Sequence, residues 1–431
     1  MSTSHSTAVD PVLQRRAVTA AMIGNATEWY DYAVYGYLAV VLGEVFFPSE
    51  NTTLSLLASF TTFAVAFVVR PLGAFLLAPL NDRIGRKRTL SITILTMAAA
   101  TAAIGLLPGH DTLGVLAPVL LIVARMVQGF AVGGEYGGAA TFVVEYAPDA
   151  RRGLWASWLE FGAIGGFLVA SGLVTYLTAV LPEAALHAWG WRIPFLLALP
   201  LGVIGLYLRL RLTDTPKFTA LTEQAAEATA PVRETLAGHK LSVLICGGIV
   251  IYSSIGTYVL LTYMPTYLEQ ELGMPTTQAQ ALIFIAGAVL TALIPIGGTL
   301  SDRFGRRAML GAAAIGYVVL AGPAFWLITR GEWTPTLLGL LVLTLCHVPV
   351  LGTTTATLPA LFPARIRGTG VAIGYNVSFA VFGGTAPLLM TALVAATGNR
   401  YVPAIYLVLV ALVALVPILA SRESARTPLP G

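Results

Sequence analysis

The sequence predicts an all-α membrane protein of twelve transmembrane helices, arranged as two six-helix repeats with both termini in the cytoplasm. Three observations support this prediction. The chain is 56% hydrophobic and only 11% charged, whereas soluble domains carry about 25% charged residues. Long apolar stretches recur along it, and two short motifs occur twice. Because the stretches are unbroken, they exclude an outer-membrane barrel, whose strands alternate in segments of about ten residues.

The apolar stretches are long enough to cross a bilayer, which takes about 20 helical residues. In chain order they cover residues 17–43, 54–79, 89–107, 115–140, 154–181, 193–211, 241–268, 280–300, 308–328, 336–360, 369–396 and 402–420. The first stretch is too long for a signal peptide and contains Glu28 and Asp31, so we expect it to be a retained helix.

The distribution of basic residues predicts the orientation. Of the 25 Lys and Arg residues, 20 fall in the N-terminus, the C-terminus and every second connection between the stretches, when Arg209 and Arg211 at the end of the sixth stretch are counted with the connection that follows it. Cytoplasmic loops of membrane proteins collect Lys and Arg, so these segments are predicted to be cytoplasmic. The opposite connections contain only Arg192, Arg330 and Arg400. The net charge of +4 is explained by this topology, and no nucleic-acid partner is expected.

Two motifs recur at nearly the same spacing, which indicates a duplicated half. The segment Leu80–Arg88 (LNDRIGRKR) recurs as Leu300–Arg307 (LSDRFGRR), and Pro148–Gly153 (PDARRG) recurs as Pro363–Gly368 (PARIRG). We therefore expect an N-terminal six-helix bundle in residues 1–212, a cytoplasmic linker in 213–240 and a C-terminal six-helix bundle in 241–431. Repeats in the same orientation place a binding site between them near the midplane.

The first of these motifs is a candidate cytoplasmic latch. A glycine allows a tight turn, an Asp can cap the following helix or pair with a basic residue, and the arginines hold the loop at the membrane surface. The predicted latch residues are Asp82, Arg83, Gly85 and Arg86 in the first copy and Asp302, Arg303, Gly305 and Arg306 in the second. The alternative is a rigid loop that only obeys the charge rule.

This Asp-Arg-x-Gly-Arg-[Arg/Lys] loop resembles the signature of the major facilitator superfamily. Further segments resemble its metabolite:proton symporter family, namely Gly24–Asp31 (GNATEWYD), Arg70–Gly73 (RPLG), Gln128–Tyr136 (QGFAVGGEY) and Trp189–Phe195 (WGWRIPF). That family includes transporters of proline and betaine, 2-oxoglutarate, citrate and shikimate. Leu261–Leu268 (LTYMPTYL) and Thr357–Pro363 (TLPALFP) are most similar to its proline/glycine betaine branch.

The resemblance implies proton-coupled uptake of a small organic solute by alternating access, in a multi-pass protein of the bacterial inner membrane. A zwitterionic osmolyte such as proline or glycine betaine is the expected substrate. Proton symport of an organic acid and a non-transporting sensor are the alternatives. We expect a monomer with no cofactor, the proton being the coupling ion. We expect no enzyme, because HExxH, GxSxG and paired Cys/His motifs are missing from the sequence.

The chain ends at Gly431, soon after the last stretch, without heptad repeats. Transporters of the osmolyte branch often carry a charged C-terminal coiled coil that adjusts their response to osmotic pressure. The resemblance to the osmolyte branch therefore does not extend to osmotic activation, which the sequence leaves open.

Charged residues inside apolar stretches are the main candidates for proton coupling, because a charge at that depth is costly and faces a cavity or a partner. Glu28 and Asp31 are three residues apart and project from one helix face, so both are predicted to take and release the coupling proton. Arg125 lies at a similar depth on the fourth helix and is predicted to compete for the carboxylate or to orient an anionic substrate group. The alternative is a permanent pair between the first and fourth helices.

Two further carboxylates, Glu135 and Glu160, are predicted to act in transport, or else to pair with Arg70 or the latch. Glu145 is assigned to the latch network. A substrate with an ammonium group and a carboxylate requires aromatic faces and an arginine. The aromatic candidates are Trp29, Tyr30, Tyr35, Trp155, Trp158, Tyr258 and Tyr263. For each of them, ordinary packing or anchoring at the membrane surface is the alternative.

Overall fold

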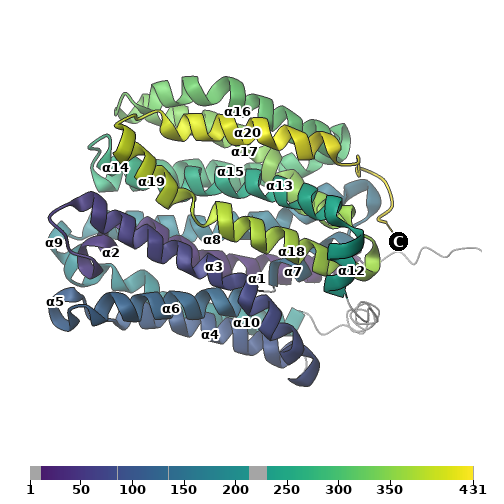
Figure 1. The fold of residues 1–431 in the computed structure, drawn as a ribbon, viewed down its shortest axis with the longest axis horizontal. Helices are drawn as coiled ribbons and strands as arrows, with labels where there is room; N and C mark the ends of the chain where they lie inside the picture. Colours follow the sequence, from purple (N-terminus) through teal and green to yellow (C-terminus); the bar gives the residue numbers. More distant parts are fainter. Residues whose placement is uncertain (1–10, 85, 134, 213–230, 431) are drawn as a thin grey trace, which may run out of the picture.

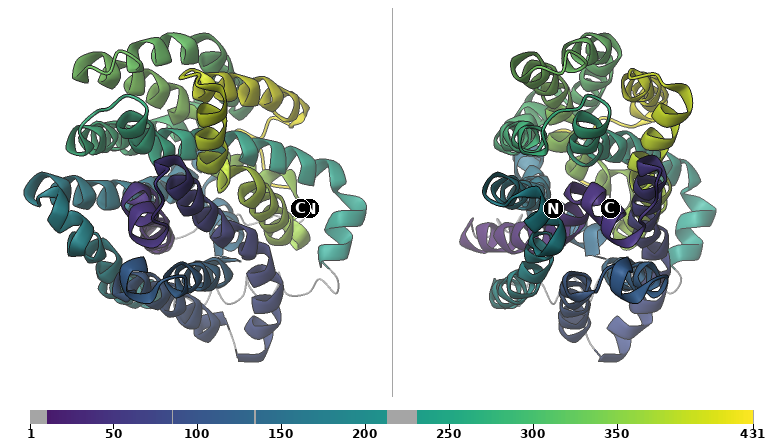
Figure 2. Two further views of the ribbon diagram at one scale, coloured as in Figure 1. Left: turned by 60° about the vertical axis from the view of Figure 1, so that its left-hand side comes forward. Right: turned by 90° about the vertical axis from the view of Figure 1, so that its left-hand side faces the viewer.

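The computed structural model describes residues 11–84, 86–133, 135–212 and 231–430. Within these ranges the regular structure is helical, and most helices lie side by side along one direction (Figure 1). Residues 11–212 fill most of the lower part of that view and residues 240–420 most of the upper part. Two further views show the same helices obliquely and almost end-on (Figure 2).

The first half contains α1 (Pro11–Tyr37), α2 (Ala39–Phe46), α3 (Thr52–Ile84), α4 (Arg86–Leu106), α5 (His110–Leu113), α6 (Leu116–Val132), α7 (Glu135–Tyr146), α8 (Arg152–Val180), α9 (Glu183–Ala185) and α10 (Arg192–Leu212). The second half contains α12 (Pro231–Gly238), α13 (Lys240–Thr257), α14 (Met264–Gln270), α15 (Thr276–Phe304), α16 (Arg306–Ile328), α17 (Trp333–Thr357), α18 (Arg367–Ser378), α19 (Ala386–Thr397) and α20 (Val402–Ala420).

Each apolar stretch predicted from the sequence coincides with one or two of these helices. Among the described residues, 9 segments are long and apolar enough to cross a membrane, or up to 10 if the bent pair Glu183–Gly190 and Arg192–Tyr207 is one span. Helix α1 is not among them, because Glu28, Asp31 and their polar neighbours lower its mean hydropathy.

Two spans are interrupted near their middle by π-helical turns. Helix α13 continues through Tyr258–Tyr263 into α14, and α18 continues through Phe379–Gly383 towards α19. Such turns widen a helix locally and are frequent at functional sites. Here they place Tyr258 and Phe379 next to each other, with ring centroids 5.5 Å apart.

Helix α8 of the first half packs against α15 of the second half. At one end of this contact, the Thr277 hydroxyl donates a hydrogen bond to the Thr178 carbonyl (2.9 Å). At the other end the backbones almost touch, since a Cβ added to Gly298 would lie 2.6 Å from the Gly153 carbonyl oxygen. Glycine is therefore required for the close approach of the two halves at this point.

Helices α3 and α6 of the first half also approach backbone to backbone. A Cβ on Gly129 would lie 1.8 Å from the Ala66 carbonyl oxygen, and one on Gly73 would lie 2.0 Å from that of Phe130. Arg70 and Arg125 lie about one turn along their helices from this contact, and both side chains are buried.

Candidate transport site

A cavity lies between the two halves of the molecule. The first half contributes Trp29, Tyr136, Glu160, Ala163, Ile164 and Phe167, and the second half contributes Val250, Ser253, Ser254, Thr257, Leu351, Thr354, Tyr375 and Phe379. The lining thus combines aromatic rings, hydroxyl groups and one carboxylate. Aromatic faces attract cations, and a carboxylate beside them adds an opposite charge.

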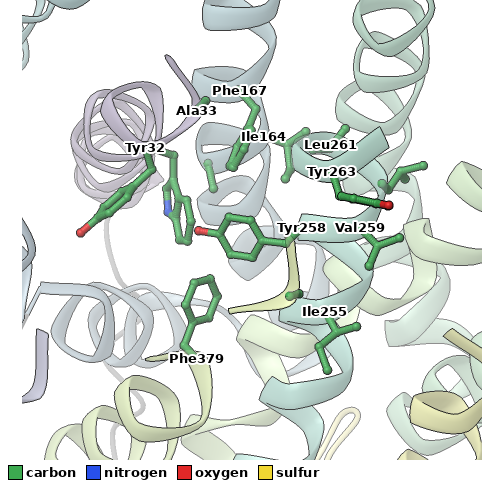
Figure 3. Close-up of a cluster of buried hydrophobic side chains, with 14 of the residues drawn as sticks. Tyr32, Ala33, Ile164, Phe167, Ile255, Tyr258, Val259, Leu261, Tyr263 and Phe379 are labelled. Carbon is green, nitrogen blue, oxygen red and sulfur yellow. The ribbon is translucent and has the colours of Figure 1, made fainter. Parts of the chain in front are cut away.

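An aromatic cluster borders this cavity, and Figure 3 shows Tyr258 at its centre beside Phe379 and Phe167. The Trp29 ring centroid lies 5.3 Å from that of Phe379 and 5.8 Å from that of Phe167. The Tyr258 ring lies 5.6 Å from that of Phe67. Its hydroxyl group is buried and has no hydrogen-bond partner within the described part of the chain.

The Glu160 carboxylate is held by hydroxyl groups from both halves. Tyr136 donates to it over 2.5 Å, and Thr355 donates to the same oxygen over 2.9 Å. The Tyr136 ring stacks on Tyr375 of the second half, with centroids 3.8 Å apart. Glu160 therefore connects the halves on the wall of the cavity. The side chain of Glu135 lies outside the described residues.

Asp31 and Arg125 belong to one hydrogen-bonded chain of four side chains. Arg125 donates to Gln128 (2.9 Å), Gln128 donates to the Thr101 hydroxyl (2.6 Å), and Thr101 donates to Asp31 (2.9 Å). The Arg125 guanidinium also donates to the Phe63 carbonyl (3.0 Å). The predicted partners are thus linked through Thr101 and Gln128, two residues that the sequence analysis did not select.

Glu28 forms an ion pair that the sequence analysis also did not foresee. Its carboxylate accepts a hydrogen bond from Arg70 of α3 over 3.0 Å. Both side chains are buried, with 7% of Glu28 and 1% of Arg70 exposed. From the sequence, Arg70 was expected only as an alternative partner of Glu135 or Glu160.

A second, smaller pocket lies within the first half, between α1, α4 and α6. It is lined by Gly24, Thr27, Glu28, Asp31, Thr93, Ile94, Met97, Ala131 and Val132. Glu28 and Asp31 both border it, as expected from their spacing on one helix face. The lining residues of this pocket and of the central cavity do not overlap.

Of the aromatic candidates, Trp29 lines the central cavity and Tyr258 borders it. The others are held elsewhere. The Tyr30 hydroxyl donates to the Pro194 carbonyl, and the Tyr35 hydroxyl donates to the Ser59 carbonyl. Trp158 packs on Phe161, and Tyr263 packs on Tyr267. Trp155 is partly buried against the core. Five further aromatic residues of the site could not be distinguished from ordinary apolar residues in the sequence: Phe67, Tyr136, Phe167, Tyr375 and Phe379.

In the second latch copy, Asp302 caps helix α8 of the opposite half. Its two carboxylate oxygens accept from the backbone N–H of Gly153 (2.7 Å) and Leu154 (2.9 Å). Arg306 lies 3.8 Å from Asp302 and donates to the Ala356 carbonyl. Nearby, Arg367 pairs with Glu145 across the halves.

Gly305 has a φ of +97°, which permits the turn between α15 and α16, and Arg303 lies over the Phe304 ring. In the first copy, Gly85 and the side chains of Asp82, Arg83 and Arg86 lie outside the described residues.

A helical bundle with a cavity between two halves, and with contacts across the halves at both ends of that cavity, has the architecture of a secondary transporter. The sequence matches the Major Facilitator Superfamily over residues 21–381 and again over 249–430. The chain belongs to this family.

Its relatives include the glycine betaine/proline/ectoine/pipecolic acid transporter OusA of Dickeya dadantii, which is 42% identical over 99% of this chain and 86% of its own. The proline/betaine transporter of Escherichia coli K12 is 41% identical over 99% of this chain and 87% of its own. Among solved structures, the proton:xylose symporter XylE superposes with a TM-score of 0.76, at 18% identity over 97% of this chain and 98% of that one.

Proposed function

We propose that this chain is a proton-coupled transporter that carries a zwitterionic osmolyte, such as proline or glycine betaine, into the cell by alternating access. Its relatives in Dickeya dadantii and Escherichia coli are named as transporters of these solutes. The chain works as a monomer in the bacterial inner membrane, without a cofactor.

The topology that goes with this function has twelve membrane crossings and cytoplasmic termini. The nine apolar spans and the bent pair account for ten crossings, and α1 and α4 supply the other two. In this scheme residues 1–212 and 241–431 form two bundles that rock against each other, and residues 213–240 connect them on the cytoplasmic side.

The observation that carries the substrate proposal is the lining of the central cavity. A quaternary or secondary ammonium group gains attraction from the faces of Trp29 and Phe379 and from the Glu160 carboxylate, which lines the same cavity. Hydroxyl groups of Ser253, Ser254 and Thr354 complete a polar wall. A di-anionic organic acid would meet repulsion from Glu160 at this site.

Glu28 and Asp31 take up the coupling proton from outside and release it inside. Both border the pocket between α1, α4 and α6, which gives them space for exchange away from the substrate. Arg125 acts on Asp31 through Gln128 and Thr101. One proton supplies about 2.3 kcal/mol per 100 mV of membrane potential.

The proposal is tested with purified protein reconstituted in liposomes under an imposed proton gradient. Uptake of proline or betaine, unaffected by excess citrate, 2-oxoglutarate or shikimate, is the expected result. Proton-driven uptake of an organic acid instead would reject the osmolyte assignment, and no uptake of any of the five would favour a sensor.

The Asp31→Asn variant tests the proton role. It should lose gradient-driven accumulation while it keeps exchange of external for internal substrate, because exchange needs no net release of the proton. An unchanged accumulation ratio would exclude Asp31 as a coupling group.

A further inference from the structure

We infer that Arg70 binds the carboxylate of the substrate, and that Glu28 occupies this guanidinium when substrate is absent. The inference rests on the proposed function, because it assigns the anion-binding part of the same site. From the sequence, Arg125 was predicted for this role.

The first observation is the incomplete hydrogen bonding of Arg70. Its Nη2 donates to Glu28 over 3.0 Å, whereas Nε and Nη1 are buried and have no partner among the described residues. A buried unpaired donor is costly, and a guanidinium binds a carboxylate best through two parallel N–H groups. An ion pair made through one nitrogen therefore leaves capacity for a second carboxylate.

The second observation is the position of Arg70 behind the wall of the central cavity. Its guanidinium carbon lies 5.8 Å from the ring centroid of Phe379, which lines the cavity. It also interacts electrostatically with Tyr258 and Tyr375 of the second half. Arg70 is thus a first-half cation that faces the second half at the level of the aromatic cluster.

Arg125 is less suited to bind the substrate. Its two terminal nitrogens already donate to Gln128 and to the Phe63 carbonyl. Its guanidinium lies over the rings of Tyr35 (4.5 Å), Phe63 (5.2 Å) and Tyr32 (5.4 Å). None of these residues lines the central cavity.

The ion pair explains how substrate and proton become coupled. While Glu28 is ionised it competes with the substrate carboxylate for Arg70, and once it is protonated the guanidinium is released to the substrate. The charged and titratable groups that face Glu28 are Asp31 and Tyr32 on α1, Arg70 on α3, and Tyr258 and Tyr375 from the second half. Among the described side chains, Arg70 pairs with Glu28 directly.

The test compares glycine betaine with choline, which carries the same trimethylammonium group but no carboxylate. Binding of both ligands to purified protein is measured for the wild type, Arg70→Gln, Glu28→Gln and the double variant. Arg70→Gln should weaken betaine binding about tenfold to a hundredfold, the loss expected for a charged hydrogen-bonded contact, and leave choline binding unchanged. The preference for betaine then disappears.

Glu28→Gln should keep the preference and bind betaine at pH 8 at least as tightly as the wild type, because the competing carboxylate is gone. Arg70→Gln leaves Glu28 without this partner and is prone to misfold. The double variant, which has no charge at either position, provides the folded test and should also have lost the preference. Arg330→Gln removes an exposed arginine that lies over Trp326 and should change neither affinity.

These measurements distinguish failure of the proposed function from failure of the Arg70 assignment. If the wild type binds no betaine, the proposed function fails. If the wild type prefers betaine to choline and the folded double variant keeps that preference, the assignment of Arg70 is wrong.

Discussion

In the proposed topology, replacement of Asp302 by Ala should open the cytoplasmic side of the protein. The carboxylate accepts two backbone hydrogen bonds from the start of α8, at 2.7 and 2.9 Å, and so joins the halves. Loss of such a cap costs about 2 kcal/mol at the upper end of measured values, and 1.4 kcal/mol is a factor of ten. We therefore expect an increase of about 30-fold in the ratio of cytoplasm-open to closed molecules.

Cysteine labelling measures this ratio. Cys246 and Cys346 are both buried and are replaced by Ala, and Thr354, a cavity residue that is 2% exposed, is replaced by Cys. A membrane-impermeant maleimide added to the cytoplasmic face should label the Asp302→Ala variant about 30 times faster than the parent, because the rate follows the open fraction.

The control is Glu332→Ala, which removes an exposed carboxylate at the start of α17 and should leave the labelling rate unchanged. Thermal unfolding of each variant checks that faster labelling does not come from unfolding. An Asp302→Ala protein that is folded and is labelled at the parental rate would refute the latch, and Asp302 would then be only a helix cap.

Three further predictions follow from single contacts. Thr101→Val removes the hydroxyl between Gln128 and Asp31, so proton-driven accumulation should fall while exchange persists; equal loss of both would argue against the hydrogen-bonded chain. Burial would raise the pKa of Glu423, but backbone hydrogen bonds from residues 306, 307, 424 and 425 lower it below its usual value. The stability that ionised Glu423 contributes is therefore complete above the ordinary carboxyl pKa of 4.5 and is lost on acidification below it. The melting temperatures of the wild type and Glu423→Gln should accordingly converge below pH 4.5. A difference in melting temperature that stays constant with pH would contradict this. Gly298→Leu inserts a side chain at a position where even an added Cβ would lie only 2.6 Å from the Gly153 carbonyl oxygen. This variant should raise the rate of cytoplasmic labelling of the Thr354→Cys protein. Slower labelling would mean that the halves separate elsewhere.

The helices could be predicted from the sequence because each one is encoded locally. An apolar stretch of about 20 residues has few alternatives to a helix in a bilayer. The π-helical turns at Tyr258–Tyr263 and Phe379–Gly383 could not be predicted, because a single extra residue in a helical turn leaves the apolar pattern intact.

The acidic residues of the site could be selected from the sequence, but their partners could not. A charge in an apolar stretch is visible at once, whereas its partner depends on how the neighbouring helices are rotated. The contact of α3 with α6 through Gly73 and Gly129 is close to Arg70, which reaches Glu28 on α1. No feature of the sequence gives that rotation. Tyr136, Tyr375 and Phe379 were missed for a similar reason, since their role depends on the meeting of the two halves.

The contacts at the two ends of the cavity differ in kind, and from this difference we expect one end of the transporter to open before the other. At the end near Thr178, the halves are joined by neutral hydrogen bonds, from Thr277 to the Thr178 carbonyl and from Gln280 to the Tyr37 carbonyl. At the opposite end they are joined by charged groups, Asp302 on the start of α8 and Arg367 on Glu145. Hydrogen bonds to charged groups contribute about twice as much as neutral ones. The end near Thr178 therefore separates at lower cost. In the proposed topology that end faces outwards, so we expect a substrate-free molecule to open to the outside first, as uptake requires.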